Sequence, residues 1–187
     1  MIPSEVAESL RNHRDPKIRD EARRLLAGVS ATRSGVPLGD LERILGESSG
    51  NPYAGEPLFS QRCAACHRLF FKGGHLGPDL TAYQRDNLRT LLPSILDPNA
   101  EIREGYAAAE VTLKDGRVLQ GILRDRDSQV VVLRGLDGQD LPLRLSDVES
   151  VQPLGRSLMP EGLLEGLTDT QLRDLFAYLR RSQPFTR

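Results

Sequence analysis

The sequence predicts an α+β chain, with helices at both ends and a β-rich segment between them. Apolar residues follow a helical period up to about residue 105, alternate from 106 to 153, and return to a helical period near the C-terminus. Asp-Gly pairs at 115–116 and 137–138 indicate tight hairpin turns within the alternating segment. Five short strands joined by such turns are typical of a small barrel or rolled sheet, so we expect a five-stranded β-barrel over 106–153.

Composition and charge are those of an ordinary globular protein. Of the 187 residues, 39% are hydrophobic and 27% are charged, which allows a sizeable core. The formal net charge is −1, so the bulk charge does not favour nucleic acid or an anionic membrane as a partner. No run of about 18 apolar residues is present, and membrane insertion by this segment is not expected.

Residues 1–50 predict a helical extension. Asp15 is a suitable N-cap, Pro16 suits the first helical position and Gly28 follows the helix end, while a second short helix is expected over 38–45. The apolar stripe of the first helix consists of Ile18, Ala22, Leu25 and Leu26. This first helix resembles the second half of a HEAT-type repeat, and the alternative is an ordinary amphipathic helix that packs on this domain.

Two further helices are expected on either side of a cysteine motif. The first runs over 55–63, where Pro57 is tolerated only in the first turn. The second follows a cap at Thr81 or Asp86 and is kinked or split by Pro93. The last helix of the chain begins at the capping box formed by residues 168–171 and has an apolar face of Leu172, Leu175, Phe176 and Leu179.

The only two cysteines, Cys63 and Cys66, belong to one Cys-x-x-Cys-His motif that ends at His67. This spacing is used for covalent attachment of c-type haem: each thiol adds to a vinyl group, and the histidine coordinates the iron from one side. We therefore expect one covalently attached haem c. A structural zinc site would need four ligands, and beyond Cys63, Cys66, His67 and His75 there is no second cysteine pair. A thioredoxin-like pair would require a βαβ pattern that is absent here.

Met159 is the main candidate for the second axial ligand. The other methionine is Met1, whereas Met159 lies in a loop before the last helix and is followed by a proline that favours an extended backbone. A thioether opposite histidine favours electron transfer. His75 lies too soon after His67 to cross the haem easily, and His13 has no accompanying motif. The alternative for Met159 is that it fills a gap in the core.

Pro78 is a candidate support for His67. An iron-bound histidine donates its second ring N–H to a fixed acceptor, which the carbonyl of Pro78 could provide, and Gly77 would let the chain approach the ring. The expected apolar wall comprises Leu58, Phe59, Phe70, Leu80, Leu91, Leu92, Leu158 and Leu163.

Several motifs in this order resemble a small monohaem, His/Met-ligated cytochrome c. They are Gly55-x-x-Leu58-Phe59, Cys63-x-x-Cys66-His67, Gly77-Pro78-x-Leu80, Met159-Pro160 and the closing Leu172, Leu175, Tyr178 and Leu179. The segments 94–99 and 159–163 make the resemblance more specific. Together with the motifs above, they are similar to the haem-binding domains of planctomycete and verrucomicrobial multidomain proteins, and this resemblance covers roughly residues 53–183. The resemblance implies a mainly α cytochrome c fold with an inserted β-barrel. It also implies thioether attachment at Cys63 and Cys66, axial ligation by His67 and Met159, and Pro78 as the acceptor for His67.

The expected organisation is a helical extension over 1–50, a haem domain over 53–105 and 154–187, and an inserted module over 106–153. The insert resembles an Sm-like or SH3-like barrel, but its acidic residues outnumber its basic ones and nucleic-acid binding is not expected. We interpret it as a lid over one haem edge or a docking surface.

Proteins of the resembled family carry HEAT-type repeats and dehydrogenase domains. The resemblance therefore implies an electron relay from a fused or partner dehydrogenase, and a domain that is not itself an enzyme. The N-terminus has no leader pattern, so we expect a piece of a longer exported protein that is periplasmic or otherwise extracytoplasmic. The alternative function is a haem-based sensor of small ligands, or a peroxidase, in which Met159 is displaceable.

Overall fold

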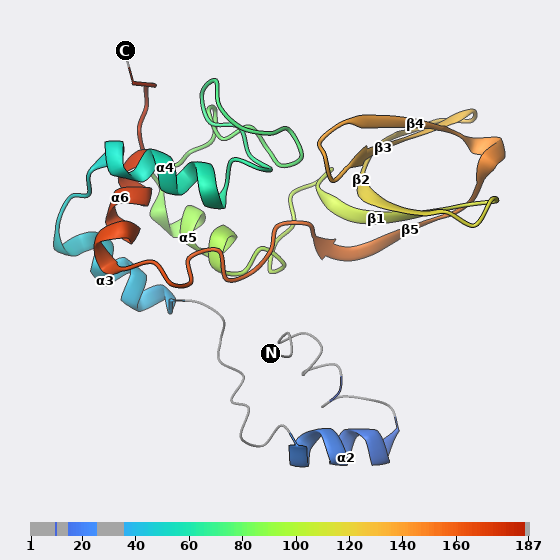
Figure 1. The fold of residues 1–187 in the computed structure, drawn as a ribbon, viewed down its shortest axis with the longest axis horizontal. Helices are drawn as coiled ribbons and strands as arrows, with labels where there is room; N and C mark the ends of the chain where they lie inside the picture. The colour runs from blue at the N-terminus through green and yellow to red at the C-terminus, as the bar shows by residue number, and fades with distance from the viewer. Residues whose placement is uncertain (1–9, 11–14, 26–35, 186–187) are drawn as a thin grey trace.

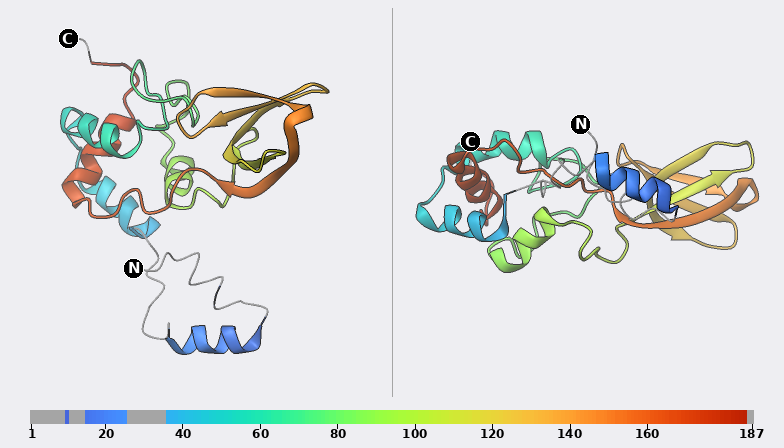
Figure 2. Two further views of the ribbon diagram at one scale, coloured as in Figure 1. Left: turned by 45° about the vertical axis from the view of Figure 1, so that its right-hand side comes forward. Right: turned by 90° about the horizontal axis from the view of Figure 1, so that it is seen from below.

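The computed structural model describes residue 10 and residues 15–25 and 36–185. Helices α3 to α6 gather in one part of the molecule, and a five-stranded antiparallel sheet forms the other part (Figure 1). Figure 2 shows the same two parts from two further directions. The predicted α+β architecture is therefore confirmed.

Helix α2 spans Pro16–Leu25. The Asp15 carboxylate accepts a hydrogen bond of 2.8 Å from the backbone N–H of Lys17, as expected for a cap. Ala22 is buried, but Ile18 is 41% exposed, so the predicted apolar stripe is not buried along its whole length. Outside the described residues lie His13, Leu26, Gly28 and the side chain of Leu25.

Four helices build the haem-motif half of the chain: α3 (Leu38–Glu47), α4 (Pro52–Arg62), α5 (Leu88–Leu96) and α6 (Asp169–Leu179). Helix α4 packs on α6, where the rings of Phe59 and Tyr178 lie 5.5 Å apart between centroids. A side chain at Gly55 would place its Cβ 1.9 Å from the carbonyl oxygen of Asp174, so glycine permits this close helix contact.

Two helix starts differ from the prediction. Asn51 caps α4 and Pro52 begins it, which places Pro57 inside the helix rather than in its first turn. Helix α5 is capped by Asn87, not by Thr81 or Asp86. The hydroxyl of Thr81 is otherwise engaged, because it accepts a hydrogen bond of 2.7 Å from the N–H of Phe70. Pro93 lies within α5, which remains one helix.

The predicted start of the last helix is confirmed. The side chain of Thr168 accepts from the N–H of Gln171, and the Gln171 side chain accepts from the N–H of Thr168, which completes the capping box. The four predicted apolar positions of α6 are all buried: Leu172, Leu175, Phe176 and Leu179.

The sheet consists of β1 (Ala107–Leu113), β2 (Val118–Arg126), β3 (Val130–Gly135), β4 (Asp140–Arg144) and β5 (Val148–Ser157), with a short 3-10 turn at Leu145–Asp147 before β5. Its order is β4-β3-β2-β1-β5, with every neighbouring pair antiparallel. Four strands thus follow one another by hairpins, and the fifth returns to pair with the first.

The expectation of a barrel was wrong, because the sheet is not closed. It curls around its own core (Figure 1), yet β4 and β5 are its two edges and do not pair. Pro142 in β4 and Pro153 in β5 each lack the N–H that a closing ladder would use. The core inside the curl comprises Ala109, Val111, Leu113, Val131, Leu133 and Val148.

Strand β5 continues past the expected end of the insert at residue 153. Ser157, its last residue, pairs with Ala107, the first residue of β1. The chain therefore leaves the sheet beside the point where it entered, two positions before Met159.

Candidate haem site

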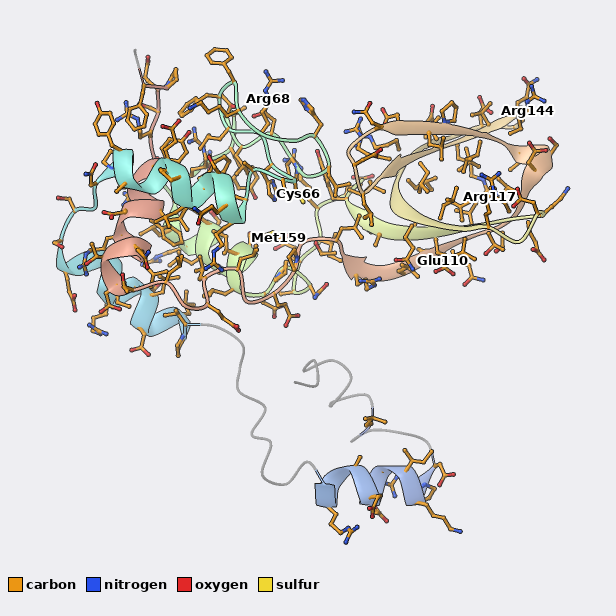
Figure 3. The ribbon with its side chains drawn as sticks, viewed as in Figure 1. Cys66, Arg68, Glu110, Arg117, Arg144 and Met159 are labelled. Atoms are coloured by element: carbon orange, nitrogen blue, oxygen red, sulfur yellow. The ribbon has the colours of Figure 1, made fainter. Side chains whose placement is uncertain are left out.

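A cavity lies where the helical part meets the sheet. Its volume is about 160 Å³, it opens to solvent, and its walls are mainly apolar, as in cofactor pockets. Cys63, Cys66, His67 and Met159 all line it. Figure 3 shows Cys66 and Met159 at this junction. The structure thus brings together the four residues that the sequence singled out for haem attachment and ligation.

The motif turns sharply at the end of α4. Cys63 is the C-cap of that helix, and its N–H and that of Ala64 both bond to the carbonyl of Phe59. The Cys63 carbonyl in turn accepts from the N–H groups of Cys66 and His67, at 3.2 Å and 2.9 Å. This turn places both thiols and the imidazole on one wall of the cavity.

The ring of His67 is held in a fixed orientation. Its Nδ1 lies 3.0 Å from the carbonyl oxygen of Pro78. A carbonyl can only accept, so Nδ1 carries the proton and Nε2 keeps a free lone pair for a ligand. A Cβ on Gly77 would lie 2.6 Å from Cε1 of this ring, which accounts for a glycine at that position. The predicted contact with Pro78 is present, while ligation by His67 stays a prediction.

Burial keeps the three motif side chains uncharged. It raises the pKa of the Cys63 thiol to about 11, against a smaller opposing effect of the Arg62 charge. Burial also raises the pKa of Cys66, and neither cysteine is in a disulfide. The pKa of His67 is lowered by burial, which outweighs its hydrogen bond to Pro78. The motif therefore offers two free thiols and a neutral imidazole, and the neutral imidazole has the lone pair that iron coordination needs.

Met159 lies in a loop that is held from two sides. Its N–H donates to the hydroxyl of Ser157 at 3.0 Å. The side-chain oxygen of Asn99 accepts from the N–H of Ser157 at 2.9 Å, and its side-chain nitrogen donates to Glu161 at 3.1 Å. Sequence reasoning missed this role of Asn99, although the residue belongs to a segment, 94–99, that carried the family resemblance.

Half of the residues that were predicted to form the apolar wall line the cavity. Leu80, Leu91, Leu158 and Leu163 line the cavity. Leu58, Phe59, Phe70 and Leu92 do not, because they pack into or against the core of the helical part instead. Lining residues that the sequence did not reveal include Tyr83, Ile95, Ile102, Arg103, Tyr106 and Ile122.

The sheet forms one wall of the cavity and is tied to the loop after the motif. Ile122 of β2 and Tyr106, which precedes β1, line the cavity. Arg134 of β3 donates to the carbonyl of His75 at 2.9 Å and forms an ion pair with Asp140. His75 itself is exposed, at the surface where it was expected. These contacts support the interpretation of the insert as a lid.

Two further observations on the described residues concern a zinc site and a membrane-spanning helix. Among residues 15–25 and 36–185, no group of three or more His, Cys, Asp or Glu side chains is arranged to hold a metal ion, which gives no support to a zinc site. Within the same part of the chain, no helix has the length and apolar character needed to cross a membrane.

Comparisons with known proteins agree with the motif. Residues 53–132 match the family model described as cytochrome c, a span that includes Cys63, Cys66, His67 and Pro78 but ends before Met159. A solved structure of the pleiotropic translational regulator Hfq matches with 15% identity and a TM-score of 0.24, over 35% of this chain and 98% of that chain. No curated protein matches the sequence. The family match supports a cytochrome c haem-binding domain, of the class that serves haem-based electron transfer, in this part of the chain.

Proposed function

We propose that this chain transfers electrons through one haem c, bound covalently by Cys63 and Cys66 and ligated axially by His67 and Met159. A bound haem of this kind supplies a single iron that alternates between the ferric and ferrous states. The observation that carries the proposal is the shared cavity, in which all four side chains meet within mainly apolar walls.

The chain's own residues fit this group by their chemistry. The thiols are not in a disulfide, so the S–H of each can add across a vinyl group. Pro78 fixes the tautomer and orientation of His67, which leaves Nε2 available. Leu91, Leu158 and Leu163 contribute apolar surface to the cavity. An apolar surrounding and a thioether ligand both favour a stable ferrous state over oxygen chemistry.

We further propose the setting in which this transfer occurs. The domain passes electrons from a dehydrogenase, either fused to it or a separate partner, and is not an enzyme by itself. Because haem c is attached outside the cytoplasm, the domain works in the periplasm as part of a longer exported protein. The motif resemblance over residues 53–183 supports this setting.

A second candidate function is supported by the surroundings of Met159. Its side chain is only half-buried, and the hydrogen bonds that hold its loop are near the surface. If a small molecule displaced this thioether, the same site would serve as a gas sensor or a peroxidase.

Absorption spectra of the oxidised and reduced protein test the two functions against each other. Stable His/Met ligation gives the ferric protein a near-infrared sulfur-to-iron charge-transfer band, and the substitution Met159→Ala should abolish it. A spectrum unchanged by that substitution would refute Met159 as ligand. Rapid binding of carbon monoxide to the reduced parent protein at neutral pH would favour the sensor instead.

A further inference from the structure

Asn99 connects the end of α5 to both sides of the Met159 loop. Its side chain accepts from the backbone N–H of Ser157 and donates to the carboxylate of Glu161, so it bonds two positions before and two positions after Met159. These partners lie 58 and 62 positions along the chain from Asn99. The contact is therefore a product of the fold rather than of a local turn.

Asn99 is itself fixed to a helix that lines the cavity. Asp97 caps the C-terminus of α5, where its N–H bonds to the carbonyl of Pro93. The Asp97 carboxylate then accepts from the N–H groups of Asn99 and Ala100, at 3.3 Å and 3.1 Å. An Asx turn of this kind limits the directions that the Asn99 side chain can take. The series of contacts from α5 to the Met159 loop is continuous.

The loop has one further internal bond, from the N–H of Met159 to the hydroxyl of Ser157. Ser157 is also the last residue of β5. The backbone before Met159 is therefore set by the sheet, and the first hydrogen-bonded link after it to the helical part runs through Glu161 and Asn99. Without Asn99, the hydrogen bond from this loop to the helical part would be the longer one of 3.4 Å that Arg62 donates to the carbonyl of Leu163.

We propose that Asn99 is a positioning residue for Met159, which keeps the thioether in the cavity and thereby sets how readily a small ligand displaces it. This inference rests on the proposed His67/Met159 ligation. It also identifies what separates the two candidate functions, because a firmly held loop favours electron transfer and a released loop favours ligand binding.

The test is a titration of the ferric, haem-loaded full chain with imidazole, which competes with the thioether. Asn99→Ala removes two exposed hydrogen bonds to the loop, and we expect imidazole to bind about 10-fold more tightly. Asn99→Asp retains an acceptor for Ser157 but places a second carboxylate beside that of Glu161, and the repulsion between them should also release the loop and raise the imidazole affinity. The near-infrared charge-transfer band should weaken in both Asn99 variants.

Asn87→Ala is the matched control, because Asn87 caps the other end of α5 and bonds to the N–H of Arg89 rather than to the Met159 loop. Its imidazole affinity should stay within about twofold of the parent protein. Amide hydrogen exchange gives a second readout that does not depend on ligand binding. The N–H of Ser157 should exchange faster in Asn99→Ala and at the parental rate in Asn87→Ala.

Equal imidazole affinities and equal Ser157 exchange rates in Asn99→Ala and Asn87→Ala would overturn the inference. If Met159→Ala abolishes the charge-transfer band but Asn99→Ala changes neither affinity nor exchange, the positioning role alone is wrong. If Met159→Ala leaves the spectrum of the parent protein unchanged, the ligation itself is wrong and both proposals fall.

Discussion

Replacing Gly77 by alanine directly tests how tightly the chain is packed against His67. A Cβ at this position would lie 2.6 Å from Cε1, 2.8 Å from Nδ1 and 3.0 Å from Nε2 of the ring. The ring cannot withdraw without stretching its bond to Pro78. The backbone cannot withdraw without stretching the 2.8 Å bond from the Gly77 N–H to the carbonyl of Cys66.

The expected cost follows from these contacts. Overpacking of a filled site destabilises by about 1–3 kcal/mol. A weakened hydrogen bond, either that of His67 or that of Gly77, adds about 1 kcal/mol. We therefore expect Gly77→Ala to lower the free energy of unfolding by about 2–4 kcal/mol. Because the ring is forced to move, the absorption spectrum of the haem-loaded protein should change as well.

Gly46→Ala is the control, since a Cβ at Gly46 in helix α3 would meet no atom within 4 Å. In a helix this change should be neutral or stabilise by up to about 1 kcal/mol. Urea unfolding followed by circular dichroism measures both variants. A free energy of unfolding for Gly77→Ala within about 0.5 kcal/mol of the control, with an unchanged haem spectrum, would refute the steric reasoning.

Two other predictions concern the helical part and the sheet. Arg85 is buried and donates to the carbonyls of Leu179, Arg181 and Thr81. Arg85→Met should cost about 2–4 kcal/mol in urea unfolding because these acceptors lose their donor. Arg62→Met, which removes one 3.4 Å bond, should cost less, and equal losses would contradict this account. In the sheet, hydrogen bonds from the N–H groups of Gln129 and Val130 hold the pKa of Asp127 below its ordinary value of 3.8. The stabilisation is therefore present above pH 3.8 and is lost as the pH falls through the lower folded pKa. Asp127→Asn keeps an acceptor without this titration, so its acid unfolding curve should be flatter. If the circular dichroism titrations of Asp127→Asn and of the parent protein superimpose, the stabilising role assigned to Asp127 is wrong.

Local patterns in the sequence predicted local features of the structure. The capping box at Thr168 spans 3 positions and the segment from His67 to Pro78 spans 11, so the chemistry of each is visible within one short stretch. Met159 was singled out because Met1 is the only other methionine and because the segment 159–163 carried the resemblance, and the structure places Met159 on the cavity.

Features that depend on distant segments could not be predicted in this way. Asn99 reaches partners far along the chain, and Ile122 reaches the cavity from the second strand of the sheet. The segment 94–99 carried the resemblance but does not show which residues Asn99 would bond to, and the sequence around Ile122 predicts only a strand. The open edge between β4 and β5 was missed for a related reason: alternation predicts strands, whereas closure depends on how far the whole sheet curls.

The pairing of Ala107 with Ser157 has a consequence for how the chain folds. Strands β1 to β4 form successive hairpins, each of which closes a short loop, and only the return of β5 to β1 joins distant positions. Once β5 has paired, Met159 is connected to the segment after α5 by a few residues instead of by the whole length of the insert. Loop-closure entropy grows slowly with the length of free chain, so the formed sheet lowers the entropic cost of bringing Met159 to the cysteine motif by about 0.6 kcal/mol for each halving of the connection. After the sheet has formed, the chain that separates the two halves of the cavity is therefore short.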